Sequence, residues 1–141
     1  MIAIPQFFAA LFIGFFYYML AAVVTVYEDP LSFIFQPIMG LFFTFFALMP
    51  LYIVGLPIRA VPSVNEWWRA HWWLPLLLGT VAFIMMIASA LPLFEITVYD
   101  PYLEKEVQTL NPWLSIVGWL FTLFSVLHFY PPFKGSDLLE I

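Results

Sequence analysis

Side chains suited to redox or nucleophilic chemistry are scarce in this sequence. It has no cysteine, which excludes thiol nucleophiles, thiolate metal sites and disulfides. Its two histidines, His71 and His128, adjoin Trp-rich and Tyr-rich segments. A haem or quinone site is the redox alternative, but a haem pair usually comes from facing helices, and His71 falls in a predicted connection. We therefore predict no cofactor, and we expect both histidines near the membrane interface, satisfied by water or backbone.

Catalytic motifs are also absent. The sequence contains no H-E-x-x-H metal motif, G-x-S-x-G elbow, phosphate-binding loop or dinucleotide fingerprint. Glu66, Arg69 and His71 would be the candidate group of a lipid-active enzyme, but this trio is short-range and generic. The acidic residues within 95–106 match no cation-binding loop and are expected in a solvated turn. We predict a protein without catalytic or metal-binding residues, and an enzyme is the weakest alternative.

The composition predicts which solvent surrounds these side chains. Hydrophobic residues make up 65% of the 141 residues, aromatic residues 21% and charged residues only 9%. A soluble domain has roughly 25% charged residues, so the surface of this chain needs lipid rather than water. A net charge of −5, with four basic residues, also excludes a nucleic-acid partner, which requires a basic face.

The positions of the charged residues define the elements. They leave four long intervals without charge: 1–27, 30–58, 70–94 and 107–133. Each interval exceeds the ~20 residues that a helix needs to cross a bilayer. The first run lacks a preceding basic residue and is too long for a signal-peptide core, so we expect it to remain as a helix. We predict an all-α integral membrane protein of one domain, 1–141, forming an antiparallel four-transmembrane-helix bundle. Its spans are placed at about 5–27, 31–56, 74–94 and 112–130.

The basic residues predict the orientation. Arg59, Arg69 and Lys134 fall in the second connection and the C-terminal tail, whereas the first and third connections are mainly acidic. Because cytoplasmic loops are enriched in Lys and Arg, both termini are expected in the cytoplasm. We place the protein in a bacterial inner membrane.

The connections differ in the structure that they predict. Residues 27–30 favour a tight turn, with Pro30 at the start of the second helix. The β-prone runs 96–99 and 107–110 predict an extracytoplasmic β-hairpin-like loop between the third and fourth helices. Asn111 before Pro112 is a typical N-cap for the fourth helix.

The second connection, 57–73, has the most unusual local composition. Ser63 or Asn65 is expected to cap a short helix that carries two tryptophan pairs. Tryptophan is typical of the membrane–water interface, and we expect the arginines to contact lipid phosphates or acidic groups of a partner. Helical spacing does not place all four tryptophan rings on one side, so we expect only some of them to face lipid. The candidate interface residues are Trp67, Trp68, Arg69, Trp72, Trp73 and Arg59. An interfacial anchor is the main interpretation, and a partner-binding surface is the alternative.

Small and weakly polar residues mark the predicted helix contacts, because lipid offers no hydrophobic drive for helix association. In the fourth span such residues recur at spacings of three, four and three on one face. The helix-packing or pore-lining candidates are Gln36, Gly40, Thr44, Ser115, Gly118, Thr122 and Ser125. We favour an internal bundle, and a seam between copies of the chain is the alternative.

The predicted spans contain no Asp, Glu, Lys or Arg, and ion or proton pathways usually require such residues. We therefore predict a non-catalytic accessory, assembly or immunity-type subunit that docks on a membrane partner or self-associates. The expected partners are the lipid bilayer and either further copies of the chain or a larger membrane complex. The alternative is an oligomeric channel or small-solute transporter, since uncharged hydroxyls and carbonyls can also line a conducting path.

Overall fold

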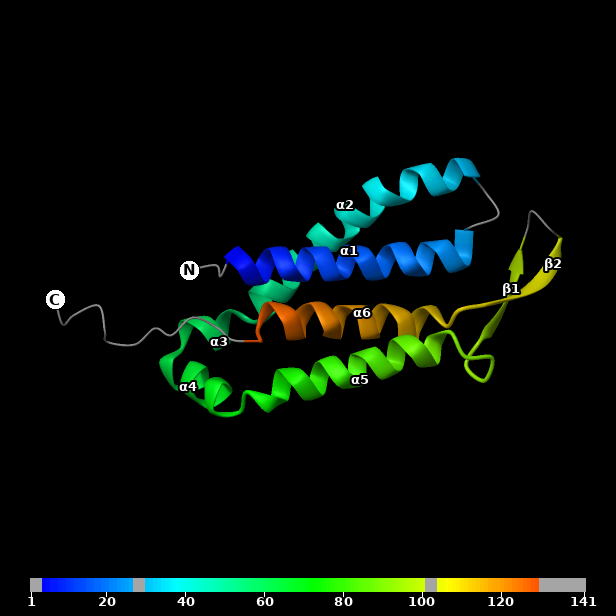
Figure 1. The fold of residues 1–141 in the computed structure, drawn as a ribbon. Coiled ribbons are helices and arrows are strands. Elements are labelled where there is room, and N and C mark those ends of the chain that lie inside the picture. Colours follow the sequence, from blue (N-terminus) through cyan, green and yellow to red (C-terminus); the bar gives the residue numbers. More distant parts are fainter. Residues whose placement is uncertain (1–3, 27–29, 101–103, 130–141) are drawn as a thin grey trace.

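The computed structural model describes residues 4–26, 30–100 and 104–129. This part of the chain is mostly helical and carries one small antiparallel sheet (Figure 1). In chain order its elements are α1 Ile4–Val26, α2 Pro30–Val54, α3 Leu56–Ala60, α4 Pro62–Ala70, α5 Trp73–Ser89, β1 Ile96–Asp100, β2 Lys105–Thr109 and α6 Pro112–Leu127.

Two of the helices are long and apolar enough to cross a membrane. α1 has 23 residues and α2 has 25, which correspond to about 34 and 37 Å at 1.5 Å per residue. Both exceed a hydrocarbon core of about 30 Å. α4 and α5 qualify together, although they bend by 68° at the break between them, while the 16 residues of α6 span about 24 Å. The described residues thus provide two candidate spans, or three with the bent pair.

The third predicted span is too long. It was expected to reach residue 94, but α5 ends at Ser89 and the chain turns before β1. The amides of Ala90 and Leu91 bond back to the carbonyls of Ile87 and Ala88, which tightens the chain into turns. Pro92 then has no amide hydrogen with which to continue a helix.

α6 lies in the middle of the molecule. It packs against α5 on one side and against α1 and α2 on the other, and α1 also packs against α2 (Figure 1). Ala10, Leu48, Leu123 and Leu127 form the buried core between α1, α2 and α6. The α3–α4 segment lies at one end of the helices and the hairpin lies at the other.

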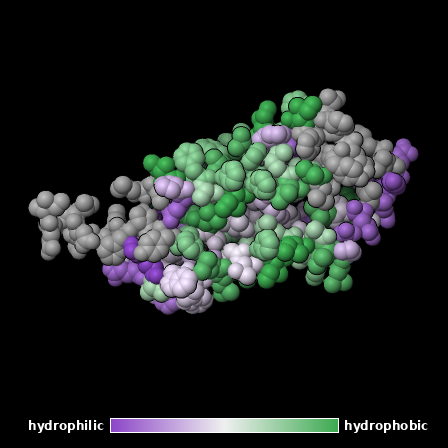
Figure 2. Space-filling view, viewed as in Figure 1, coloured by the Kyte–Doolittle hydropathy of each residue, from purple (hydrophilic) through white to green (hydrophobic). Residues whose placement is uncertain are grey.

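The outer surface matches a lipid environment. In the view of Figure 2, hydrophobic residues form a band over the helices, and hydrophilic residues gather at the two ends. Exposed Phe, Leu and Ile side chains continue along α1, α2 and α5. Since water would penalise such a surface, the fold supports membrane association.

The predicted hairpin is confirmed, with shifted bounds. β1 and β2 pair antiparallel from Ile96 opposite Thr109 to Asp100 opposite Lys105. The second strand therefore begins at Lys105 rather than at residue 107, because an oppositely charged pair extends the ladder. The turn residues 101–103 lie outside the described residues, as does the predicted turn at 27–29.

The second connection contains two short helices rather than one. Proline in the first turn of α3 and of α4 explains both starts, since that position needs no amide donor. Neither Ser63 nor Asn65 caps α4, because its N-cap is Val61. Asn65 is buried instead, and its Nδ2 donates to the carbonyl oxygen of Ile58 at 2.9 Å. This bond ties α4 to α3.

Candidate functional site

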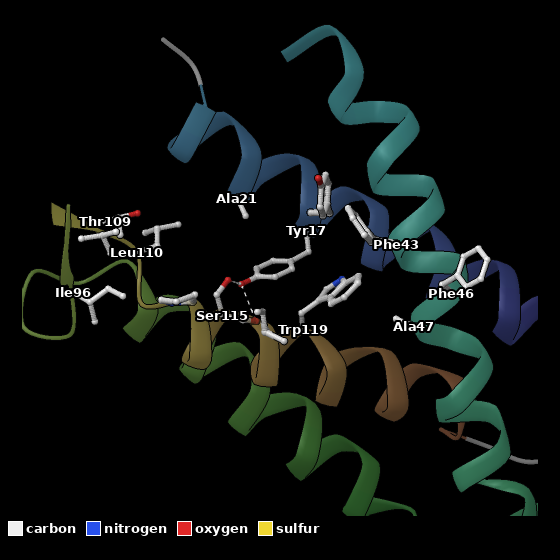
Figure 3. A pocket seen from close by; sticks show the side chains of 14 residues that line it. Tyr17, Ala21, Phe43, Phe46, Ala47, Ile96, Thr109, Leu110, Ser115 and Trp119 are labelled. Atoms are coloured by element: carbon white, nitrogen blue, oxygen red, sulfur yellow. Dashed lines mark hydrogen bonds between the residues drawn. The ribbon is translucent and has the colours of Figure 1, made fainter. Parts of the chain in front are cut away.

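A cavity of about 690 Å³ lies between α1, α2, α6 and the hairpin, and it is here called the lateral groove (Figure 3). This volume falls within the roughly 300–1,000 Å³ of typical ligand sites. Its lining residues are Tyr17, Tyr18, Ala21, Phe43, Phe46, Ala47, Ile96, Val98, Thr109, Leu110, Pro112, Ser115, Ile116 and Trp119.

The polar groups of the aromatic side chains that line the groove already form hydrogen bonds within the protein. The Tyr17 hydroxyl lies 2.6 Å from Ser115 Oγ, and Figure 3 shows the ring pointing across from α1 to α6. Trp119 Nε1 donates to the carbonyl oxygen of Gly14 at 3.0 Å. The Tyr18 hydroxyl donates to Gln36 Oε1 at 2.7 Å. The groove therefore offers these side chains mainly as apolar surface.

The hairpin extends the groove beyond the helices. Ile96 and Val98 lie two apart on β1, so they share one face of the strand, and both line the groove. Thr109 and Leu110 add the end of β2 and the segment that leads into α6. Asn111 then caps α6, since its Oδ1 accepts from the amides of Trp113 and Leu114. This cap determines where α6 begins beside the groove.

A second polar arrangement lies at the opposite end of the helices, around Arg59 of α3. This arginine is 6% exposed. Its Nη2 donates to the carbonyl oxygen of Leu127 at 2.6 Å and to Gln6 Oε1 at 3.4 Å, and its Nε donates to His128 Nδ1 at 3.4 Å. The guanidinium carbon also lies 5.3 Å from the centre of the Tyr52 ring. These five residues are here called the Arg59 cluster.

The Arg59 cluster holds a charge among neutral groups. Each hydrogen-bond acceptor of Arg59 given above is uncharged, and burial lowers the pKa of its guanidinium, an effect that the Tyr52 hydroxyl partly opposes. Within the described part of the chain, Nη1 of Arg59 is buried without a hydrogen-bond partner. A buried donor of this kind is rare in folded proteins and calls for an explanation.

The two histidines have different surroundings. His128 is fully buried, its Nε2 lies 3.3 Å from the carbonyl oxygen of Leu51, and its ring packs directly on Gly55, where no Cβ would fit. His71 is half-buried, and its Nδ1 lies 2.7 Å from the carbonyl oxygen of Trp67. Backbone groups thus contact both rings, but His128 lies inside the fold rather than at an exposed interface.

The Trp-rich connection divides its candidate residues between surface and interior. Trp68 Nε1 donates to the carbonyl oxygen of His128 at 2.8 Å, and its ring meets Phe124 edge-on. Arg69 is partly exposed on α4. Arg59 departs most from expectation, since it is directed into the bundle rather than toward headgroups. The exposed indoles are Trp67, Trp72 and Trp73.

The small and polar candidates of α6 lie at two different contacts. Ser115 faces α1, as described above. Gly118 lies against the α5 backbone, where a Cβ would come within 2.9 Å of the Ala82 carbonyl oxygen. Ser125 donates to the carbonyl oxygen of Pro75 on α5 at 2.5 Å, and Thr122 donates to the carbonyl oxygen of Gly118 at 2.9 Å.

The candidates on α2 lie at a third contact, with α1. Gly40 lies close to the Tyr18 ring, and Gln36 accepts from the hydroxyl of the same tyrosine. Thr44 is fully buried, and its Oγ1 donates to the carbonyl oxygen of Gly40 at 2.7 Å. The pore-lining candidates therefore lie at three separate helix contacts. Thr44 and Thr122 bond within their own helices, whereas Gln36, Ser115 and Ser125 bond to neighbouring helices.

Sequence reasoning missed both the lateral groove and the Arg59 cluster. Neither has a local motif, since the groove combines residues of α1, α2, α6 and the hairpin, and the cluster combines α1, α2, α3 and α6. The available signal for the cluster was an arginine beside prolines between two apolar runs.

Comparisons with known proteins supply no relative. No family model, curated protein or solved structure matches the chain. Within the described residues, no three His, Asp or Glu side chains come together in a way that would hold a metal ion.

Proposed function

We propose that the protein is a non-catalytic subunit of a bacterial inner membrane that receives a transmembrane helix of a partner in the lateral groove. The observation that carries this proposal is the groove itself, an apolar recess between α1, α2 and α6 that continues onto the hairpin. The partner is either another membrane protein, as for an accessory, assembly or immunity-type subunit, or a second copy of this chain.

The shape of the lining favours a helix over a lipid chain. Ala21 and Ala47 contribute small side chains, which allow close approach of a helix backbone in a membrane. Ile96 and Val98 carry the apolar surface onto the hairpin, outside the helices. A helix that leaves the bilayer would contact both parts, whereas an acyl chain ends at the headgroups.

The topology that goes with this function has four crossings and both termini in the cytoplasm. In it, α5 crosses while α4, bent by 68° from it, lies at the membrane interface. α5 and α6 cross with the help of local membrane thinning, as short helices can. Arg59 and Arg69 lie together at the end opposite the acidic hairpin, which supports this orientation by the positive-inside rule.

Site-specific photo-crosslinking in native membranes tests the proposal. A photoreactive phenylalanine derivative replaces Phe46, which lines the groove, and in a control replaces Phe35 on the same helix, which does not. Both side chains are exposed to a similar extent, at 56% and 61%. We expect a protein adduct from position 46 and none from position 35. An adduct of twice the chain's mass would identify a second copy as the partner.

Two results would overturn the proposal. One is a set of adducts at position 46 that contain lipid only. The other is the same protein adduct in equal amount from positions 46 and 35, because contact would then not depend on the groove.

A further inference from the structure

The Arg59 cluster contains a charge that its visible partners do not neutralise. Arg59 is almost fully buried, and Nη1 lacks a partner within the described residues, while Nη2 and Nε bond to neutral acceptors. Removing an ion from water without an opposite charge costs several kcal/mol in proteins. An arginine placed in this way is therefore suited to receive an anion.

The contacts of Arg59 leave it free to adjust toward such an anion. Only the bond to the carbonyl oxygen of Leu127 is short, at 2.6 Å. The bonds to Gln6 and His128 are both 3.4 Å, beyond the usual range for N–H donors. To bind an anion, the guanidinium would give up these two weak bonds and keep the strong one, and long basic side chains reach toward headgroups in this way at membrane interfaces.

The location of the Arg59 cluster indicates which kind of anion is available to it. α3 lies beside α4. The exposed indoles of Trp67 on α4, Trp72 in the turn after it and Trp73 at the start of α5 lie close by in the chain. Exposed tryptophans of this kind gather at headgroup depth, where lipid phosphates are abundant. The planar fork of a guanidinium also matches the oxygens of a phosphate group.

We infer that Arg59 binds the phosphate of an anionic lipid headgroup through Nη1 while Nη2 stays on the carbonyl oxygen of Leu127. This inference does not depend on the proposed groove function, because the two sites lie at opposite ends of the helices and share no residue.

Lipid binding to the delipidated protein tests this inference. Native mass spectrometry in mild detergent compares phosphatidylglycerol with phosphatidylcholine of identical acyl chains. Both contain phosphate, but only the first is anionic. We expect phosphatidylglycerol to bind about tenfold more tightly, as one charge-assisted contact would produce. Inorganic phosphate at millimolar concentration forms a second arm, and we expect it not to displace the lipid.

Two matched variants assign the contact. Arg59→Met keeps a long side chain and removes the charge. Arg69→Met removes the neighbouring, partly exposed charge on α4. We expect the first to lose the tenfold preference and the second to retain it, with far-UV circular dichroism showing that both variants are folded.

The opposing outcomes are distinct. Equal binding of both lipids by the unmodified protein would overturn the inference, as would a preference that survives Arg59→Met. Displacement by inorganic phosphate would retain the anion contact but overturn the lipid as its source. A third result would also overturn the inference, namely a preference for phosphatidylglycerol that is seen only in the variant Asp137→Asn with Glu140→Gln. It would indicate that Arg59 normally pairs with carboxylates of the chain itself.

Discussion

The two sides of α6 pack against their neighbours in different ways. Toward α5, the helices meet through Gly79, Ala82 and Gly118, so that the backbone of α5 lies against α6. Toward α2, Phe43 and Phe46 of α2 and Trp119 of α6 all line the lateral groove. The α5 side is closed. The α2 side is open at the lateral groove, although Leu123 and Leu127 pack with Leu48 of α2 in the buried core.

Side-chain size explains this difference. Without a hydrophobic drive between helices, association in lipid relies on close packing, which small residues allow. On the α2 side, the lateral groove is lined by large rings, those of Phe43, Phe46 and Trp119, and a recess remains between the helices. The comparison teaches that α6 is packed against α5 on one side, whereas on its α2 side it is packed around Leu123 and Leu127 and leaves a binding surface at the lateral groove. The following predictions test this division.

The largest effect is expected on the closed side, from Gly118→Leu. A Cβ there would lie 2.9 Å from the carbonyl oxygen of Ala82 and 3.1 Å from Met86 Cγ, so α5 would have to move away. We expect a loss of about 3 kcal/mol in the free energy of unfolding. Titration with a denaturing detergent, followed by circular dichroism, measures it.

The control for this prediction is Ile116→Phe, which enlarges a half-exposed side chain on the open face of the same helix. It should change the free energy of unfolding by less than about 0.5 kcal/mol. Equal losses in the two variants would contradict the division between a closed and an open side.

An intermediate effect is expected at the end of α6 near the Arg59 cluster. Trp68→Ala removes the bond to the His128 carbonyl oxygen and the edge-on contact with Phe124, and should cost about 2 kcal/mol. Trp72→Ala, which alters an indole that is 57% exposed, should cost under about 0.5 kcal/mol. The same detergent titration compares the two. A larger loss in the free energy of unfolding from Trp72→Ala than from Trp68→Ala would show that the exposed indoles, rather than the packed indole of Trp68, stabilise the α3–α4 segment.

The smallest effect is expected on the open side, from Tyr17→Phe. This change removes the hydroxyl that lies 2.6 Å from Ser115 Oγ, and such a contact is worth about 0.6 kcal/mol in a membrane protein. A double-mutant cycle with Ser115→Ala measures the coupling between the two hydroxyls. Fully additive losses would show that the bond contributes nothing to joining α1 and α6.

The sequence predicted the coarse fold because its signals were local. Intervals without charge located the long helices, and α1 and α2 begin and end within a few residues of the prediction. The hairpin followed from two β-prone runs, and Asn111 caps α6 as its position before a proline predicted. The end of α5 was missed because the apolar composition continues to residue 94, beyond the last helical hydrogen bonds.

The candidate sites were harder to predict, for a physical reason. Arg59 was expected at the headgroups because arginine is usually exposed. Its burial results from acceptors on α1 and α6 that are distant in the chain. The position of Asn65 is similar, since an asparagine near a helix start suggests a cap, but the carbonyl of Ile58 on the preceding helix captures its amide.

The sequence by itself determined the solvent of this protein and its helical character, because both depend on composition and on the spacing of charges along a continuous stretch. Only the tertiary structure decided that α6 lies at the centre, that a groove opens between α1, α2 and α6 beside the buried core, and that Arg59 is buried. These features depend on which side chains meet across helices. The spacing of residues within one helix does not predict these contacts, because in lipid the apolar faces of helices can pair in several ways.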